Sequence, residues 1–289
     1  MKGGLAALLL ALALPALAQS PYGERAEVKS FIRDLVERHG FVESELNTLF
    51  ARVYRVDPVL QAIVAPAEIA PWPDYRAMFV SPPRISGGLA FWTAQEALLA
   101  RAEREYGVPA EIIVAIIGVE TFYGRNPGRW RVVEALATLA FDYPPRAGFF
   151  RGELENYLLL ARDSGLDVFS VRGSYAGAIG IPQFMPGSLR RYAVDFDGDG
   201  AIDLSRNTAD AIGSVANYLK QHGWRTGEAV QRKQGTPDEA AGDRTIDLGT
   251  ERRVGLANFQ ALMRYNRSPL YAAAVADLAE ALRAQRPGR

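Results

Sequence analysis

Apolar residues recur every three or four positions along most of this 289-residue chain, a spacing typical of helices. The pattern predicts helices within residues 24–64 and over 91–106, 110–120, 131–139, 149–163, 210–222 and 271–284. The segment over 110–120 is apolar nearly all round, as in a helix that is buried on every side. The spacing therefore predicts a mainly α (α+β) protein built around one buried helix.

Two segments depart from the helical pattern. Residues 65–84 are rich in proline and include Trp72 and Tyr75, so we expect an ordered but irregular crossing there. Residues 225–257 are polar, contain glycine and carry only a few residues that favour strands. This second segment is predicted to be a short insertion or small lobe, with or without β structure.

The N-terminus has the pattern of an export signal. Lys2 precedes an apolar run over residues 5–14, and Ala16-Leu17-Ala18 follows as a site with small residues for cleavage. The run is shorter than the roughly 20 apolar residues that span a bilayer. We expect a cleaved signal peptide over residues 1–18, the alternative being a buried first helix.

Composition narrows the chemistry. The chain has no cysteine, which excludes a thiolate nucleophile, a disulfide framework and a cysteine-ligated metal. Its two histidines, His39 and His222, lie far from any nucleophile-elbow pattern. Lys plus Arg equals Asp plus Glu, at 33 each, so no overall basic field favours nucleic acid. Acid–base catalysis therefore falls to carboxylates or tyrosines.

Glu120 is the sharpest candidate. It ends the apolar helix, just before Thr121 and Phe122. Apolar surroundings disfavour the charged form of a carboxyl group and raise its pKa, which is what a general acid at neutral pH requires. The alternative is a glutamate that turns out to solvent where the helix ends.

Two further segments carry groups suited to a sugar. The stretch 173–186 is rich in small residues and offers the neutral hydrogen-bonding groups of Ser174, Tyr175 and Gln183. The stretch 264–271 offers an amide and aromatic faces, and includes Tyr265, Asn266 and Tyr271. The alternatives are a packed structural turn for the first stretch and an ordinary helix entry for the second.

An acidic loop resembles the start of an EF-hand. Asp195, Asp197 and Asp199 stand at positions 1, 3 and 5, and a glycine stands at position 6. Position 12 is Arg206 rather than the usual glutamate, and Asp210 is the carboxylate that could close the shell from the next helix. Asp203 could substitute or supplement as a ligand, and the alternative is an Asp-Gly turn without metal.

Taken together, these segments resemble the membrane-bound lytic transglycosylase B family of peptidoglycan-cleaving enzymes. The motifs that carry the resemblance are, in chain order, IIGVET at 116–121, ALATL at 135–139, GELE at 152–155, the stretch 173–186, YAVDF at 192–196, DAIGSVANY at 210–218 and RYN at 264–266. Several independent motifs in one order are far more specific than any one of them.

The resemblance implies a lysozyme-like helical core. After the signal peptide expected over 1–18, we expect an N-terminal helical region over 19–105, a catalytic core with the EF-hand-like loop over 106–224, the short insertion or reduced β lobe over 225–257, and a C-terminal segment over 258–289 that completes the core. Segment 225–257 is much shorter than the β-containing lobe that we expect in this family, so we expect that lobe to be reduced or missing. The missing lipid-bearing cysteine implies a soluble member, free in the periplasm.

The resemblance also implies the site residues. Glu120 is the one catalytic acid and base. The residues matched to substrate binding are Ser174, Tyr175, Gln183, Tyr265, Asn266, Tyr271, Tyr75 and Arg146. A structural Ca²⁺ is implied, held by Asp195, Asp197, Asp199, Asp210 and the backbone carbonyl of Ala201, and the chemistry requires no cofactor.

The reaction implied is non-hydrolytic cleavage between N-acetylmuramic acid and N-acetylglucosamine, which leaves 1,6-anhydromuramoyl ends. The alternatives are a hydrolytic muramidase on the same fold and a non-catalytic peptidoglycan-binding scaffold. The expected partners are peptidoglycan glycan strands and cell-wall synthesis proteins, without nucleic acid and without a stable membrane anchor. We expect a monomer.

Overall fold

The chain divides into two compact units, Met1–Arg55 and Val56–Arg289. The structure, a computed structural model, describes residues 20–64, 70–233, 235–238 and 242–286. The signal peptide predicted over 1–18 lies outside the described residues. Within the described residues, no helix has both the length and the apolar character needed to cross a membrane.

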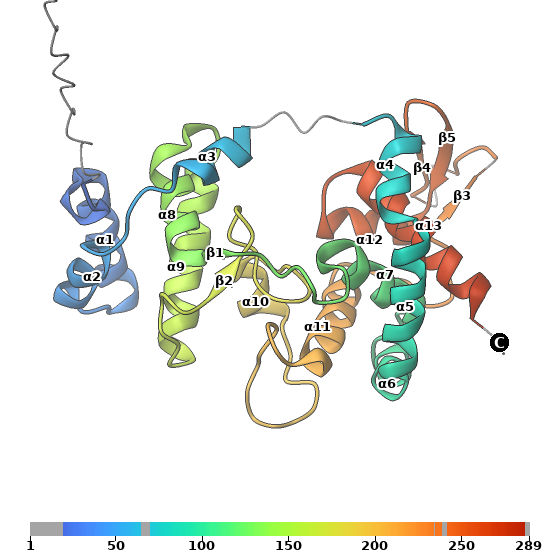
Figure 1. Cartoon of the computed structure of the whole chain (residues 1–289), viewed down its shortest axis with the longest axis horizontal. Coiled ribbons are helices and arrows are strands. Elements are labelled where there is room, and N and C mark those ends of the chain that lie inside the picture. Colours follow the sequence, from blue (N-terminus) through green and yellow to red (C-terminus); the bar gives the residue numbers. More distant parts are fainter. Residues whose placement is uncertain (1–19, 65–69, 234, 239–241, 287–289) are drawn as a thin grey trace, which may run out of the picture. The chain divides into compact units, whose positions relative to one another are not determined.

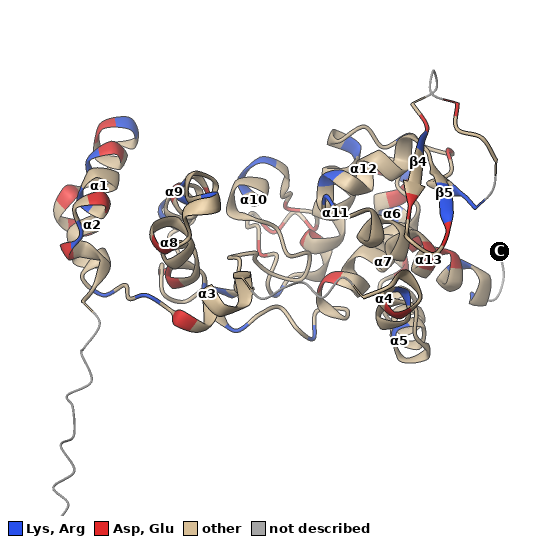
Figure 2. Ribbon diagram, turned by 90° about the horizontal axis from the view of Figure 1, so that it is seen from above, with Lys and Arg blue, Asp and Glu red and all other residues tan. Residues whose placement is uncertain are grey.

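The first unit is a small helical assembly. Its elements are the 3-10 turn η1 (Tyr22–Glu24), α1 (Ala26–His39) and α2 (Glu43–Phe50). Apolar residues on one side of each helix form its core, where the Phe31 and Phe50 rings meet edge to face at 6.2 Å. Figure 2 shows both acidic and basic residues on α1 and acidic residues on α2.

The second unit holds the remaining helices. Their bounds are α3 Asp57–Val64, α4 Trp72–Phe79, α5 Pro82–Ala94, α6 Glu96–Tyr106, α7 Ala110–Thr121, α8 Val132–Asp142, η2 Pro144–Arg146, α9 Ala147–Asp163, α10 Pro186–Tyr192, α11 Thr208–Gln221, α12 Ala257–Tyr265 and α13 Pro269–Gln285 (Figure 1). The mainly α prediction is confirmed, and the buried helix is α7, which packs against α5, α6, α11 and α13.

The strands are short. β1 (Trp130–Arg131) pairs with β2 (Arg172–Gly173) in an antiparallel ribbon. β3 (Gln231–Arg232), β4 (Arg244–Asp247) and β5 (Arg252–Gly255) form an antiparallel sheet in the order β3-β5-β4. The segment 225–257, for which the sequence left β structure open, therefore contains a small sheet.

The expectation of an irregular crossing over 65–84 is wrong for its described part. Residues 72–79 and 82–94 are helical. Pro73 and Pro82 lie in the first turns of these helices, where an amide N–H has no intrahelical partner to lose. The prolines that suggested an irregular segment therefore mark two helix starts.

Two predicted helices are interrupted. The segment 91–106 is split between α5 and α6 at Gln95, whose backbone (φ −112°, ψ 20°) is not helical. The segment 24–64 is split into α1, α2 and α3, and α1 ends where Gly40 adopts a left-handed φ of 65°. Periodicity located the apolar faces of these segments but did not detect the breaks between them.

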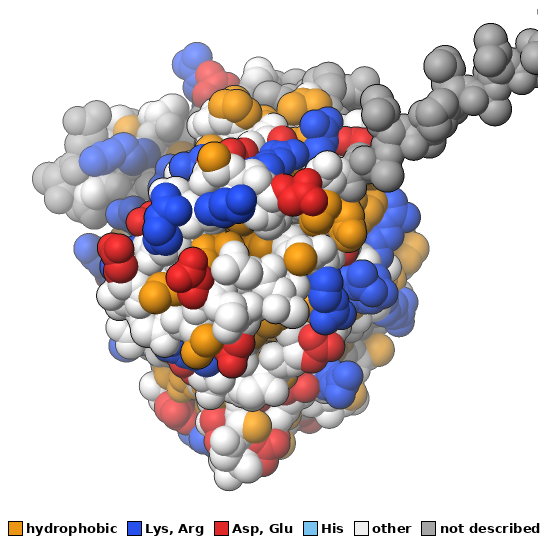
Figure 3. All heavy atoms as spheres, turned by 90° about the vertical axis from the view of Figure 1, so that its left-hand side faces the viewer, with side chains coloured by type: hydrophobic (Ala, Val, Ile, Leu, Met, Phe, Trp, Pro, Cys, Tyr) orange, Lys and Arg blue, Asp and Glu red, His pale blue; other side chains and the backbone are white. Residues whose placement is uncertain are grey.

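The surface carries both signs of charge. On the face drawn in Figure 3, basic and acidic side chains are interspersed and hydrophobic ones are scattered between them. This mixture agrees with the equal totals of acidic and basic residues in the sequence.

Candidate active site

Glu120 projects from the last turn of α7. Helix α7 begins after Pro109 and is apolar through Ile112–Ile117 on every side, because it packs against helices all round. Its C-terminal end is closed by Phe122, whose N–H donates to the Gly118 carbonyl. The carboxyl group thus lies at the end of a buried helix, as the sequence predicted.

Tyrosines from three other helices face this carboxyl group. The Tyr271 hydroxyl, on α13, donates a hydrogen bond of 2.6 Å to Glu120 Oε1. The Tyr265 ring at the end of α12 lies nearly parallel to the Tyr271 ring, with 6.5 Å between centroids. Burial raises the pKa of Tyr75 on α4 and of Tyr265, and the nearby Glu120 charge contributes to both shifts. The structure therefore brings Tyr75, Tyr265 and Tyr271 together around Glu120.

The local sequence explains how Tyr271 reaches its place. Ser268 caps α13 by accepting the Tyr271 N–H through its hydroxyl, and Pro269 occupies the first helical position. These two residues fix where the helix begins. Tyr271 is only 3% exposed, so its hydroxyl is committed to Glu120 rather than to water.

These surroundings set the protonation of the site. Desolvation raises the pKa of Glu120 to about 7, although the hydrogen bond from Tyr271 acts in the opposite direction. Burial also raises the pKa of Tyr271 and of Tyr265 well above the ordinary value, and the Glu120 charge adds to both shifts. At neutral pH the site therefore holds a carboxyl group poised between its two forms, beside phenols that stay protonated.

A loop over residues 173–186 is hydrogen-bonded to two residues that flank Glu120. The Thr121 hydroxyl, next to Glu120, donates to the Ile181 carbonyl at 2.8 Å. The Tyr265 hydroxyl donates to the Pro182 carbonyl at 2.6 Å. The loop is therefore held against the residues that flank Glu120.

The predicted sugar-binding residues of this loop also hold its shape. The Ser174 hydroxyl accepts the Ala178 N–H at 3.0 Å. Gln183 has a left-handed backbone (φ 52°), and its side-chain nitrogen donates to the carbonyls of Pro127 and Gly180 at 3.0 and 2.8 Å. Tyr175 is 40% exposed. Of these three residues, Tyr175 presents the largest free side-chain surface.

Two predicted residues lie outside this cluster. Asn266 is exposed, and its side-chain oxygen accepts the Ser268 N–H at 3.1 Å, next to the α13 cap. Arg146 is exposed at the start of α9, with its guanidinium 4.3 Å from the Phe149 ring centroid and 5.2 Å from that of Phe150. The contacts in the described residues join neither side chain to Glu120.

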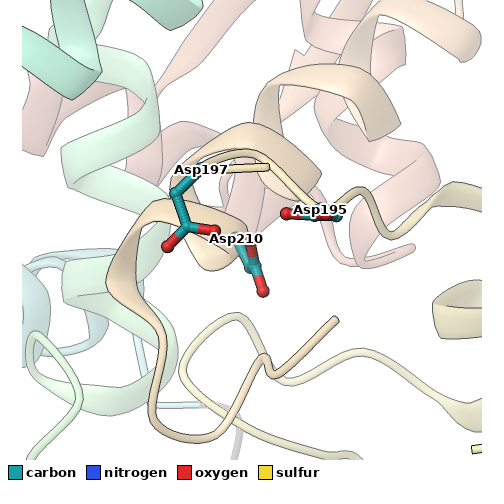
Figure 4. A group of neighbouring side chains, drawn as sticks. All are labelled: Asp195, Asp197 and Asp210. Atoms are coloured by element: carbon teal, nitrogen blue, oxygen red, sulfur yellow. The ribbon is translucent and has the colours of Figure 1, made fainter. Parts of the chain in front are cut away.

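The acidic loop gathers three of its predicted ligands. Asp195, Asp197 and Asp210 each offer a carboxylate oxygen within 4.8 Å of the others (Figure 4). Asp199 is not part of this group, and its carboxylate accepts the N–H of Ala201 at 2.8 Å. The loop therefore has the carboxylate-rich arrangement that hard cations prefer, with three side chains at its centre.

Backbone amides shape these carboxylates. The N–H groups of Gly200, Gly198 and Asp199 donate to Asp195 and lower its pKa. Burial raises the pKa of Asp210, and the nearby charges of Asp197 and Asp195 contribute to the shift. The three acidic groups repel one another, and a bound cation would relieve this repulsion.

The structure adds residues that the sequence did not single out. Thr121 ties α7 to the 173–186 loop, and its position directly after Glu120 was the available signal. Asp277 on α13 accepts hydrogen bonds from Arg253 on β5 and from Arg76 on α4, each at 2.6 Å. This buried carboxylate joins the small sheet to the helix that carries Tyr75. No local pattern indicates a contact across such separations.

Comparison with known proteins gives consistent matches. Residues 23–254 match the transglycosylase SLT domain family. Membrane-bound lytic murein transglycosylase B of Escherichia coli strain K12 is 40% identical over 303 residues, covering 90% of this chain and 84% of that protein. Both matches extend over most of the chain.

Solved structures of lytic transglycosylases are also similar to this chain. The soluble lytic transglycosylase SltB1 from Pseudomonas aeruginosa is 48% identical with a TM-score of 0.82, covering 91% of this chain and all of the other. Slt35 of Escherichia coli, solved in complex with calcium, is 40% identical with a TM-score of 0.80, covering 94% of this chain and 96% of the other. The lysozyme-like fold predicted from the resemblance is confirmed.

Proposed function

Because the chain belongs to the transglycosylase SLT domain family, we propose that it is a peptidoglycan lytic transglycosylase with Glu120 as its catalytic acid and base. The observation that carries the proposal is the Glu120 carboxyl group, which ends a buried helix with a pKa raised to about 7. A carboxyl group of this kind can give up a proton and take one back at neutral pH.

The reaction proceeds in two proton transfers. Glu120 protonates the oxygen that links N-acetylmuramic acid to N-acetylglucosamine, and the bond from the muramic C1 to that oxygen breaks. The 6-hydroxyl of the same sugar then bonds to C1, assisted by the 2-acetamido group, and its proton passes to the Glu120 carboxylate. Atoms balance without water, and the product is a 1,6-anhydromuramoyl end.

The groups around Glu120 suit a single-carboxylate mechanism. A hydrolytic glycosidase of the lysozyme type uses a second carboxylate as nucleophile or base. Here Tyr271 donates a hydrogen bond to Glu120, and the Glu120 charge contributes to the raised pKa values of Tyr75, Tyr265 and Tyr271; all three of these neighbours are phenols. The Tyr271 hydroxyl supports the carboxylate that forms after the first proton transfer.

The glycan strand lies in the space between the tyrosines and the 173–186 loop. Tyr75, Tyr265 and Tyr175 offer aromatic faces, and Ser174 and Gln183 offer polar groups beside them. Asn266 and Arg146 lie further out and contact more distant sugars. The name of the Escherichia coli relative gives murein, a glycan polymer of this kind, as its substrate.

Ca²⁺ binds the acidic loop and stabilises the fold. Asp195, Asp197 and Asp210 would hold the ion with carboxylate oxygens, and Asp199 and the Ala201 carbonyl are the further ligands that the resemblance implies. The ion would neutralise three mutually repelling carboxylates and supplies no step of the reaction. The structure of Slt35 with calcium supports this assignment.

The protein acts in the periplasm. The leader pattern at residues 1–18 supports export, and the similarity to a soluble lytic transglycosylase supports an unanchored mature chain. The protein acts as a monomer on the cell wall, where cell-wall synthesis proteins are its expected partners.

Mass spectrometry of digested peptidoglycan tests the function. Anhydro ends are one water lighter than reducing ends, so a lytic transglycosylase gives the lighter products from wild-type protein. Reducing ends alone would identify a hydrolytic muramidase and contradict the proposal. Binding to peptidoglycan without any product would identify a scaffold.

A further inference from the structure

The backbone just beyond Glu120 is strained. Phe122 and Tyr123 have φ angles of 52° and 63°, in the left-handed region that residues with a side chain rarely adopt. Two such residues in succession persist only where the surrounding structure holds them. This turn directly follows Thr121, the last residue of α7, and begins two residues beyond Glu120.

Arg84 on α5 is one of the groups that hold the turn. Its guanidinium donates a hydrogen bond to the Gly118 carbonyl, in the last turn of α7. The same guanidinium lies 5.0 Å from the Phe122 ring centroid and 5.2 Å from that of Phe79. A cation at the C-terminal end of a helix is also favoured by the helix dipole.

Tyr123 in turn contacts the helix that carries Arg84. Its hydroxyl donates to the backbone carbonyl of Arg84 at 2.7 Å. The ring packs so closely on Gly88 and Gly118 that a Cβ at either position would lie 2.5 or 2.6 Å from the hydroxyl oxygen. Arg84 and Tyr123 therefore bind each other's segments, an arrangement that we call the Arg84–Tyr123 clamp.

The clamp places a charged group where it is poorly solvated. Arg84 is partly buried, burial lowers its pKa, and its Nε is buried without a hydrogen-bond partner among the described residues. A buried donor left unpaired is unfavourable for folding. Packing alone would be served as well by an apolar side chain between Phe79 and Phe122, so the guanidinium has a more specific task.

We propose that Arg84 and Tyr123 are positioning residues that fix the turn after Glu120 and so aim its carboxyl group at the glycosidic oxygen. The inference rests on the proposed function of Glu120 as proton donor. Displacing a catalytic group by about 1 Å can slow a reaction by about 100-fold. The clamp acts on the rate of the chemical step and leaves the sugar-binding surface unchanged.

The test compares variants on a soluble oligosaccharide of alternating N-acetylglucosamine and N-acetylmuramic acid. We expect Arg84→Ala to lower kcat by about 100-fold while KM changes by less than about 3-fold. Arg84→Lys keeps the charge and should recover part of the loss. Tyr123→Phe removes one hydrogen bond and should lower kcat by about 5-fold.

Chemical rescue separates positioning from general stability. Guanidinium ion, added at millimolar concentration to Arg84→Ala, should bind between Phe79 and Phe122 and raise kcat, without raising that of wild-type protein. The matched control is Arg151→Ala. Arg151 likewise donates to a backbone carbonyl, that of Ala140 at 3.2 Å, and lies 5.5 Å from the Phe141 ring centroid. Its replacement should leave kcat unchanged.

The proposal is overturned if folded Arg84→Ala keeps the kcat of the Arg151→Ala control. It is also overturned if its loss follows the unfolded fraction measured by circular dichroism and guanidinium restores nothing. If Arg84→Ala does not fold, Arg84→Lys and Tyr123→Phe carry the same test. Product masses from wild-type protein are read in the same assay, so failure of the proposed function is recognised separately from failure of the clamp.

Discussion

The site around Glu120 and the acidic loop around Asp195 place the same chemical group in opposite surroundings. Glu120 is partly exposed at the end of a buried helix, beside tyrosines, and desolvation raises its pKa to about 7. Asp195 lies in an exposed loop whose backbone N–H groups donate to it and lower its pKa. The first carboxyl group is suited to carry a proton at neutral pH, whereas the second is suited to remain an anion that attracts a cation.

The surroundings of a carboxyl group, rather than its residue type, thus determine whether it carries a proton at neutral pH or remains an anion. The hydrogen-bond donors differ in kind as well as in number. One phenol, that of Tyr271, donates to Glu120, whereas Asp195 receives three backbone N–H groups. Four measurements test whether the two carboxyl groups differ in this way.

The largest expected effect is on turnover. Glu120→Gln removes the proton donor and should lower kcat by at least about 1,000-fold, while binding to peptidoglycan is retained. Glu111→Gln, at the other end of the same helix, is the matched control and should keep wild-type turnover. Lytic activity of Glu120→Gln equal to that of the control would place the acid elsewhere.

The second effect is on stability. The folded-state pKa of Glu120 is about 7, above its ordinary value of 4.5. Ionisation of Glu120 therefore destabilises the folded state as pH rises through the window from 4.5 to about 7. Below the window Glu120→Gln and wild type should be equally stable. Above pH 7 the variant should be more stable by up to about 3 kcal/mol. Chemical denaturation at a series of pH values measures this, and a constant difference would contradict it.

The third effect concerns the loop. Calcium that binds only the folded state at 100 times its Kd adds about 2.7 kcal/mol of stability, which raises Tm by about 5–10 °C in a protein of this size. Asp195→Asn should reduce this increase, and kcat should not change with calcium. A chelator titration without any change in Tm would argue that the loop binds no metal.

The smallest effect concerns Tyr271. Its hydrogen bond lowers the pKa of Glu120, so Tyr271→Phe should raise that pKa and move the alkaline limb of the pH–rate profile to higher pH. One hydrogen bond of about 1 kcal/mol corresponds to a shift of less than about one pH unit. A limb that moves to lower pH would mean that Tyr271 acts differently.

The sequence predicted those parts of the site that depend on local pattern. The apolar run before Glu120 identified both the buried helix and its terminal carboxyl group, because burial on every side leaves a continuous apolar stretch. The alternation of aspartates and glycines identified the acidic loop. For Tyr75, Tyr265 and Tyr271, the resemblance to a known family supplied the assignment, and the structure brings these residues together around Glu120.

Other features required the structure. The prolines near Trp72 suggested an irregular segment, but the same residue type is also favoured in the first turn of a helix, so sequence alone did not separate the two. The contact from Arg84 to Gly118 and the pairing of Asp277 with Arg253 join residues distant in the chain. Such pairings depend on how the helices pack, which no periodicity records.

The most direct test of the central claim is a titration of Glu120 itself. Carbon-13 labelling of the glutamate carboxyl groups allows each to be followed by NMR, and the resonance missing from Glu120→Gln identifies Glu120. We expect a midpoint near pH 7 for this resonance in the folded protein. A midpoint near the ordinary value of 4.5 would contradict it, because Glu120 would then be ionised and unable to protonate the glycosidic oxygen at neutral pH.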